Sequence, residues 1–258
     1  MIEKFPLVTV ITAVRNNKEG IRKTLESIFS QTYSNLEVIV IDGASTDGTM
    51  EVVREYADKI DYAVSEPDKG VYDAMNKGIA ASHGDFVNFM NSGDTFHAPD
   101  VIEAMRLEEI ENPNTLVYGD TSVTYFDGTY RERPAEFFKT RMKFKGVGIC
   151  HQTMFFPGQE LRQRRYDLSY RIVADYALVY DLWQSGTLFL YRPLIVADYE
   201  WGSGISSDPY GLIKVYRENA RVARQQWNPL YWAKILLEYW RLWRKKVTSE
   251  SETYGCNE

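Results

Sequence analysis

The sequence predicts an α/β protein built on a mostly parallel sheet with helices on both faces. Over the first 120 residues, short runs rich in β-branched residues alternate with helix-like segments. Continuous apolar strands joined by helices are typical of a parallel sheet that is covered on both faces. An aspartate lies at or just beyond the end of four of these strands. With 258 residues, the chain is long enough for one large domain or one domain with an appendage.

The first half contains five predicted strands, separated by helices. The strands are expected at residues 7–14, 36–43, 61–66, 85–91 and 115–120. The helices are expected after Asn17, through Met50 and Tyr56, near 71–82 and near 99–110. Right-handed crossovers place the ends of successive parallel strands on the same edge of the sheet.

The pattern changes beyond residue 120. Residues 122–133 predict a β-hairpin with its turn at Asp127-Gly128. Residues 136–158 read as irregular, residues 171–186 as a helix with a glycine C-cap, and residues 188–206 as one or two strands and a glycine-rich loop. We therefore expect one domain over 1–215, with halves 1–120 and 121–215. Amphipathic C-terminal helices (216–247) and a disordered tail (248–258) follow.

The composition excludes several classes of protein. The net charge of −6 and the pI near 5.3 argue against nucleic acid as a partner, because phosphate binding favours a basic surface. Cys150 and Cys256 form neither a metal-binding spacing nor a disulfide framework, which suits a reducing cytoplasm. Since no stretch reaches about 18 consecutive apolar residues, we expect a soluble protein or one attached to a membrane surface.

The aspartates at the strand ends are Asp42, Asp68, Asp94 and Asp120. In an open α/β sheet, ligands bind in the crevice beyond those ends. Carboxylates gathered there repel each other, so they need a cation, a sugar or water between them. Aspartates also favour turns and helix caps, and that alternative stays open for any one of them. The four together favour a binding site.

Three common catalytic or phosphate-binding motifs are missing. The chain has no GxGxxG after its first strand, no GxxxxGK[ST] and no GxSxG. A dinucleotide dehydrogenase, a P-loop NTPase and a serine hydrolase are therefore not expected.

The stretches VTVITAVRNN (8–17), VIVIDGASTDGT (38–49) and SEPDKGVYDAMNKGIAASHGDFVNFMNSGD (65–94) resemble family 2 of the inverting glycosyltransferases. That family has the GT-A fold, a Rossmann-like, mostly parallel sheet flanked by helices. The likeness extends to bacterial enzymes of exopolysaccharide, O-antigen and colanic-acid synthesis. It is strong over residues 7–120 and traceable in HQTMFFP (151–157), YRIVADYAL (170–178) and GSGIS (202–206).

The resemblance implies a nucleotide-sugar donor site, expected to be UDP-linked, in the first half. Its residues would be Thr12, Ala13, Arg15, Asp42, Asp68, Gly70, Asp73, Asn76, Asn91, Ser92, Gly93 and Asp94. A cation from Arg15, Lys69 or Lys77 could offset the diphosphate charge. Tyr72, Met75 and Ile79 read instead as core packing on a helix face.

The resemblance also implies a divalent metal, Mn²⁺ or Mg²⁺. NSGD (91–94) takes the place of the family's acidic triplet and keeps only its last acid, so Asp94 is the predicted metal ligand. Such an ion is held mainly by diphosphate oxygens and water, with few protein ligands. Asn91 can still hydrogen-bond ribose or bound water through its amide.

On the acceptor side, the resemblance implies that Asp175 is the catalytic base. Inverting displacement needs a base for the acceptor proton and a cation for the leaving diphosphate. Asp175 could equally be a solvated acid at a helix N-terminus. We expect His151 to line the acceptor pocket, Trp201 to stack on a sugar, and the GSGIS turn to close over the diphosphate.

The segment 221–246 differs from the rest of the chain. It carries seven Lys or Arg residues, one acid (Glu238) and four of the six tryptophans. Its predicted apolar helical face comprises Trp232, Ile235, Leu236, Tyr239, Leu242 and Trp243. A basic, Trp-rich helix favours the lipid headgroup region, which predicts peripheral membrane contact. The alternative is a helix docked onto the domain or onto a second subunit of a homo-oligomer.

Together these features predict a hexosyltransferase acting with inversion on a lipid-linked (polyprenyl diphosphate) oligosaccharide in bacterial surface polysaccharide synthesis. We expect it in the cytoplasm, at the inner face of the inner membrane. One alternative is a sugar nucleotidyltransferase, which normally needs a glycine- and arginine-rich loop where this chain has AVRNNKEG (13–20). The other is a non-catalytic subunit that binds nucleotide-sugar. It is suggested by two trimmed acidic motifs: NSGD (91–94), and Ala174-Asp175 where the family usually has a Glu-Asp pair.

Overall fold

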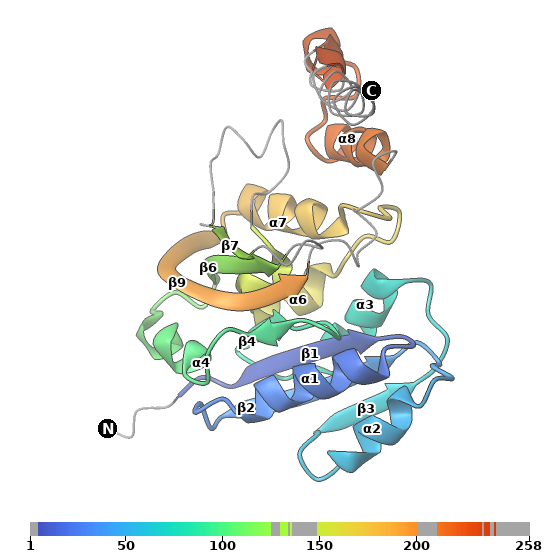
Figure 1. The fold of residues 1–258 in the computed structure, drawn as a ribbon. Helices are drawn as coiled ribbons and strands as arrows, with labels where there is room; N and C mark the ends of the chain where they lie inside the picture. The colour runs from blue at the N-terminus through green and yellow to red at the C-terminus, as the bar shows by residue number, and fades with distance from the viewer. Residues whose placement is uncertain are drawn as a thin grey trace, which may run out of the picture.

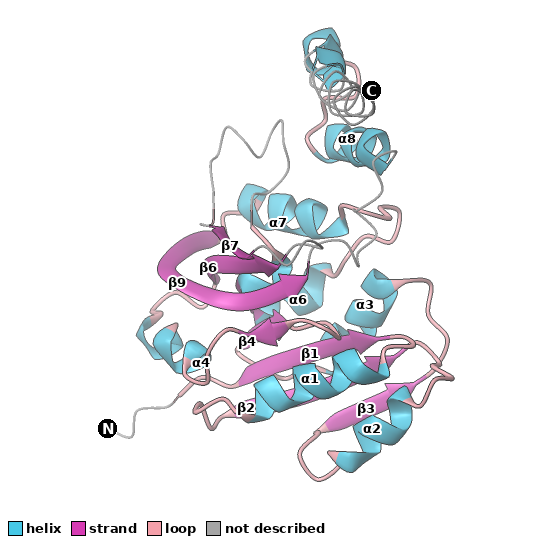
Figure 2. Cartoon of the chain, viewed as in Figure 1, coloured by secondary structure: helices cyan, strands magenta, loops and turns pink. Residues whose placement is uncertain are grey.

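A computed structural model describes residues 5–124, 130–133, 135, 149–200, 211–233, 235–237 and 240. Its centre is a nine-stranded, curled sheet with helices on both faces (Figures 1 and 2). The strands are β1 (Val8–Val14), β2 (Leu36–Asp42), β3 (Tyr62–Ser65), β4 (Phe86–Phe89), β5 (Thr95–Phe96), β6 (Thr115–Thr124), β7 (Tyr130–Arg133), β8 (Met154–Pro157) and β9 (Leu188–Glu200). Their order in the sheet is β3-β2-β1-β4-β8-β6-β9-β5, with β7 beside β6.

The helices cover the sheet in two layers, each with its own apolar core. They are α1 (Lys18–Phe29), α2 (Thr49–Glu55), α3 (Val71–Ala81), α4 (Val101–Ala104), α6 (Gly158–Arg164), α7 (Ala174–Gln184), α8 (Gly211–Val222) and the 3₁₀ turns η1 (Leu107–Glu109) and η2 (His151–Thr153). Alternate residues of β1 point to opposite faces, as the pleat of a strand requires. Val8 and Val10 pack with α1, α2 and α4, whereas Ile11 and Ala13 pack with α3, α6 and α7.

The predicted elements of the first half are confirmed. Strands β3, β2, β1 and β4 pair in parallel, so their carboxyl ends share one edge of the sheet. Helix α1 begins after Asn17, whose side-chain oxygen accepts a hydrogen bond from the backbone N–H of Gly20 at 3.0 Å. Met75 and Ile79 of α3 are fully buried, as the predicted helix face requires. The helix expected near 99–110 is instead the short α4 followed by η1.

The second half is mixed rather than mostly parallel. Strand β8 falls within 136–158, which was predicted to be irregular, and it lies antiparallel between β4 and β6. Its four residues give no periodic signal of their own, because all four are buried and so do not alternate between apolar and polar. The Asn88 amide donates to the backbone oxygens of Gln152 at 2.9 Å and Met154 at 3.0 Å, which fastens β8 to β4.

The expectation that Asp120 lies at a strand end is wrong. Strand β6 continues past it to Thr124, with register shifts on either side of Asp120. The Asp120 carboxylate accepts hydrogen bonds from the Tyr191 hydroxyl and the Ala135 backbone N–H, each at 2.8 Å. The Asp120 carboxylate is therefore held by hydrogen bonds within the second half of the sheet.

Other predictions for the second half are partly met. Strands β6 and β7 pair antiparallel as the hairpin predicts, and helix α7 is followed by Gly186 at φ 91°, a left-handed conformation that suits glycine. The expected boundary after residue 215 falls inside α8. The Asp127-Gly128 turn, Trp201, the GSGIS turn and the tail 248–258 lie outside the described residues.

The link between β4 and β8 gives a testable prediction. Asn88→Leu puts an apolar side chain of similar size into a fully buried position and removes both hydrogen bonds that the amide donates to the β8 segment. We expect the free energy of unfolding to fall by about 2–4 kcal/mol, because two carbonyl groups lose a partner. Urea denaturation followed by circular dichroism measures this loss.

The control for that measurement is Asn35→Leu. Asn35 is exposed, and its amide makes one hydrogen bond, to the Phe5 carbonyl at 2.9 Å. We expect a change below about 1 kcal/mol there, as for most surface substitutions. Equal losses in the two variants would contradict a fastening role for Asn88.

Candidate active site

Three chain segments converge where β1, β2 and β3 end. A side chain at Gly43 would overlap the Asp68 carboxylate and would lie 3.3 Å from the Cδ atom of Arg15. A residue with a side chain at position 43 would therefore displace the Asp68 carboxylate. The structure thus brings together Arg15 and Asp68, two residues predicted for the donor site.

Thr12 and Asp42, also predicted for the donor site, are fully buried. The Asp42 carboxylate accepts hydrogen bonds from the Ser45 backbone N–H at 3.0 Å, from the Ser45 hydroxyl and from the Ser65 hydroxyl at 2.5 Å. Thr12 points into the core on the α1 side, and its hydroxyl has no hydrogen-bond partner among the described residues. Neither side chain has accessible surface for a ligand in this structure. The Asp42 carboxylate instead holds two serines.

The loop from Asp68 to Asp73 is held by its own acids. Asp68 Oδ1 accepts from the Gly70 backbone N–H at 2.8 Å, and Asp73 Oδ2 accepts from the Lys69 N–H at 3.0 Å. Gly70 has φ 118°, which disfavours any residue with a side chain. These contacts define the shape of the loop that leads into α3.

Two further residues predicted on the donor side are occupied elsewhere. The Asn76 amide bridges the backbone of Tyr166, donating to its oxygen and accepting from its nitrogen, both at 2.8 Å. Lys77 pairs with Glu66 at 2.8 Å, and this contact raises the pKa of the lysine. Both therefore brace α3 against neighbouring segments.

The turn 91–94 follows β4 and is fixed from beneath by β1. The Ser92 N–H donates to the Ala13 oxygen at 3.1 Å, and the Asp94 N–H donates to the Asn91 oxygen at 3.0 Å. Gly93 has φ 106°. The chain thus makes a tight turn that a side chain at position 93 would strain.

Helix α1 supports the same turn through residues that the sequence analysis did not single out. The hydroxyl of the fully buried Thr24 accepts a hydrogen bond from the Gly93 N–H at 2.9 Å and donates one to the backbone oxygen of Asp94 at 2.7 Å. Asn17 donates from its amide to the Ser92 oxygen at 3.1 Å. The one feature of the sequence that could have indicated this role of Thr24 is its position on the buried face of a predicted helix.

A chain of polar groups joins this turn to the second half. Asn91 Nδ2 lies 3.0 Å from His151 Nε2, and His151 Nδ1 lies 3.9 Å from Asp175 Oδ2. Gln152, which was also missed, donates to Asp94 Oδ2 at 2.9 Å. Positions 91, 151 and 175 were each predicted for a site, and the structure brings them together.

Asp175 lies in the first turn of α7, where the helix dipole stabilises a negative charge. Its Oδ1 accepts from the Tyr176 N–H at 2.8 Å and lies 3.5 Å from the Tyr72 hydroxyl, which donates to the Ile172 oxygen at 2.8 Å. Burial, together with the nearby Asp175 charge, raises the pKa of Tyr72 far above its ordinary value. Tyr72, predicted to be core packing, therefore stays protonated beside the carboxylate.

The residues of the turn fit a weakly held metal. Within the part of the chain that the structure describes, no three His, Cys, Asp or Glu side chains form a metal-binding group. The Asn91 side-chain oxygen is buried without a hydrogen-bond partner among these residues, and Asp94 lies three residues further along the same turn. One carboxylate and one amide oxygen suit an ion whose other ligands are phosphate oxygens and water.

Comparison with known proteins defines the class. The fold resembles that of a mannosyltransferase from Pyrobaculum calidifontis, described in complex with GDP-Man and Mn²⁺, with a TM-score of 0.65, 19% identity, and 92% of this chain and 70% of that chain covered. It also resembles S. aureus TarS 1–349, described in complex with UDP-GlcNAc, with a TM-score of 0.66, 17% identity, and 90% and 71% covered. The sheet and its helices are thus those of a GT-A-type glycosyltransferase.

Residues 9–178 match the family described as glycosyl transferase family 2, and the chain belongs to that family. An uncharacterized glycosyltransferase of Mycobacterium tuberculosis H37Rv, Rv1514c, is 36% identical over 175 residues, just under two thirds (66%) of each chain. The PGL/p-HBAD biosynthesis glycosyltransferase Rv2957 of the same strain is 30% identical over 209 residues, covering 78% of this chain and 80% of its own.

The support of the turn 91–94 by α1 gives a second prediction. Thr24→Val keeps the side-chain shape but removes the hydroxyl that holds Gly93 and Asp94. We expect the affinity for UDP in the presence of Mn²⁺ to fall roughly tenfold, because the turn loses its fixed position. Isothermal titration calorimetry measures the dissociation constant.

Thr32→Val is the matched control, since Thr32 is exposed and its hydroxyl contacts Glu103 rather than the turn. We expect its UDP affinity to equal that of the unmodified protein. A folded Thr24→Val protein with unchanged affinity would show that the turn does not need this support.

Proposed function

We propose that the chain is an inverting hexosyltransferase that uses a nucleotide-diphosphate sugar, UDP-linked, and acts on a lipid-linked oligosaccharide in bacterial surface polysaccharide synthesis. The observation that carries this proposal is the link from Asn91 and Asp94, through His151 and Gln152, to Asp175. This link supports a catalytic base from the second half that acts beside a diphosphate site in the first half.

The donor would lie across the ends of β1, β2 and β4. Arg15 is exposed and makes no ion pair with another described residue, so its charge is available to a diphosphate. Asp68, Gly70 and Asp73 shape the loop beside it, and Ala13, Ser92 and Gly93 form the backbone beneath. UDP-GlcNAc in the TarS complex and GDP-Man in the mannosyltransferase complex support a nucleotide-sugar donor.

A divalent ion, Mn²⁺ or Mg²⁺, would be held by Asp94 together with the donor diphosphate. When bound, such an ion neutralises the charge that develops on the leaving diphosphate. The Asn91 amide oxygen would accept from a ribose hydroxyl or from an ion-bound water. The Mn²⁺ in the mannosyltransferase complex supports this assignment.

Asp175 would act as the base on the acceptor side. Its carboxylate takes the proton of the acceptor hydroxyl while the acceptor oxygen bonds to the anomeric carbon and the bond to the diphosphate oxygen breaks. Attack opposite the leaving group inverts the anomeric configuration. His151 and Tyr72 border the carboxylate and would fix its orientation, and Trp201 would stack on the acceptor sugar.

The acceptor proposal follows from the relatives. Rv2957 is named for PGL/p-HBAD biosynthesis, which supports a lipid or surface-glycan acceptor such as a polyprenyl diphosphate oligosaccharide. We place the reaction at the inner face of the bacterial inner membrane, where such acceptors are assembled. No helix among the described residues is both long and apolar enough to span a bilayer.

Removal of the base tests the proposed catalysis. Asp175→Asn keeps the shape of the side chain but cannot take a proton. We expect UDP release from a UDP-sugar and a lipid-linked acceptor to fall about 10²–10⁴-fold, with UDP affinity unchanged. Asp181→Asn on the same helix, which loses only the ion pair with Arg164 at 3.2 Å, should retain turnover.

Full turnover by the Asp175→Asn variant would show that Asp175 is not the catalytic base. If the unmodified protein instead released pyrophosphate from a nucleoside triphosphate and a sugar phosphate, it would be a nucleotidyltransferase. Nucleotide-sugar binding without any turnover would identify a non-catalytic subunit.

Metal removal tests the donor site. We expect UDP to bind more tightly than GDP, with Mn²⁺ raising the affinity and EDTA abolishing that gain. Asp94→Ala should bind UDP equally in Mn²⁺ and in EDTA, whereas the exposed control Asp58→Ala should keep the response. Calorimetric titration separates these cases. Metal-independent binding of UDP by the unmodified protein would show that Asp94 is not a metal ligand.

A further inference from the structure

The chain beyond α8 folds back along that helix. Residues 229–233 and 235–237 are helical, and Tyr231 and Ile235 are buried against Ala220 of α8. The Tyr231 hydroxyl donates to the Tyr216 oxygen at 3.1 Å. Ile235, which the sequence placed on the same apolar face as Leu236, is therefore docked onto α8.

The other side of the same segment exposes large apolar side chains. Its exposed side chains are Trp227 (90%), Leu230 (80%), Leu236 (66%), Leu237 (47%) and Trp240 (49%). Leu230, Leu237 and Trp240 are seven and three residues apart, a spacing that aligns them on one face of a helix. A helix that is apolar on both sides needs a second apolar environment.

The segment that carries this face is basic. Residues 211–240 contain five basic and two acidic residues, a net charge of +3, which leaves −9 for the rest of the chain. Lys214, Arg217, Arg221 and Arg224 are exposed, and none forms an ion pair within the described structure. One of the two acids, Glu218, is already used by the backbone N–H groups of Arg171 to Val173.

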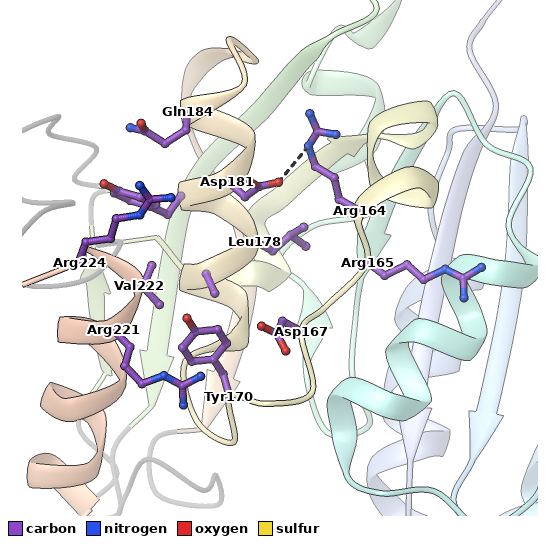
Figure 3. Close-up of a pocket in the computed structure, with 12 residues that line it drawn as sticks. Arg164, Arg165, Asp167, Tyr170, Leu178, Asp181, Gln184, Arg221, Val222 and Arg224 are labelled. Carbon is purple, nitrogen blue, oxygen red and sulfur yellow. Dashed lines mark ion pairs between the residues drawn. The ribbon is translucent and has the colours of Figure 1, made fainter. Parts of the chain in front are cut away.

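Two of these arginines border a cavity of about 480 Å³ between α7 and α8 (Figure 3). Arg221 lies 4.5 Å over the Tyr170 ring and donates to the Ser169 hydroxyl at 3.0 Å. Arg224 follows one turn later on the same wall. Planar guanidinium groups held in this way are suited to binding a phosphate.

We propose that residues 211–240 form a docking surface for an anionic lipid bilayer. Trp227, Leu230, Leu237 and Trp240 enter the headgroup region, and Arg221 and Arg224 bind lipid phosphates beside them. A second copy of this chain fits the surface poorly, because residues 211–240 carry a net charge of +3 and two such faces would repel each other. This surface would hold the proposed active site near lipid-linked acceptors, and lipid binding can be measured without any transfer reaction.

Vesicle co-sedimentation tests this docking surface. We expect the full-length protein to bind vesicles of phosphatidylglycerol and phosphatidylcholine, with weak binding to phosphatidylcholine alone. Trp227→Ser with Leu230→Ser should lower the partition coefficient at least about tenfold. Arg221→Gln and Arg224→Gln should each lower it about fivefold, because a basic residue near an anionic surface contributes about that factor.

The matched control is Tyr62→Ser, which removes a 45% exposed aromatic side chain from β3, at the opposite end of the molecule from α8 (Figure 1). It should bind vesicles like the unmodified protein. UDP affinity should be unchanged in all variants, which separates failure of docking from failure of the proposed function. Equal binding to both vesicle types, or a dimer broken by Leu230→Ser without any vesicle binding, would overturn the proposal.

Discussion

The arrangement of the candidate active site depends on the antiparallel pairing of β8 with β4. Phe86 pairs with Pro157 and Val87 with Phe156. Since the strands run in opposite directions, the start of β8 lies where β4 ends. Residues 151–152 are thereby placed against the turn 91–94, although about 60 residues of chain separate them. The two halves of the chain therefore share one site rather than forming independent units.

The amide at position 91 suits this shared site. Asp94 and Asp175 already contribute two carboxylates, and His151 lies between Asn91 and Asp175. A third carboxylate at position 91 would add like charge in a half-buried region, where charges are less screened than in water. Asn91 keeps a polar contact with His151 at 3.0 Å without that repulsion. The single remaining acid of the turn is thus compatible with a metal whose other ligands come from a diphosphate.

The sequence predicts the parts of the fold whose signal is local. Strands β1 and β2 and helix α3 are long or periodic. Asp42 is the last residue of β2, and Asp68 and Asp94 come shortly after β3 and β4. Strand β8 and the continuation of β6 beyond Asp120 depend on pairing with distant strands, which leaves no local pattern. The sequence likewise does not predict that Thr24 supports the turn 91–94, because a buried threonine on a helix is also typical of ordinary packing. Burial of Thr12 and Asp42 likewise depends on which face of the sheet each helix covers.

Helix α8 joins the C-terminal surface to the catalytic half through one carboxylate. Glu218 accepts hydrogen bonds from the backbone N–H groups of Arg171, Ile172 and Val173 at 3.0–3.1 Å. These groups directly precede α7, whose own N–H groups begin without helical partners. Asp175 lies two residues after the last of them, in the first turn of that helix. A carboxylate on α8 therefore caps the helix that presents the candidate base, so the position of α8 and the position of Asp175 are fixed by the same three hydrogen bonds.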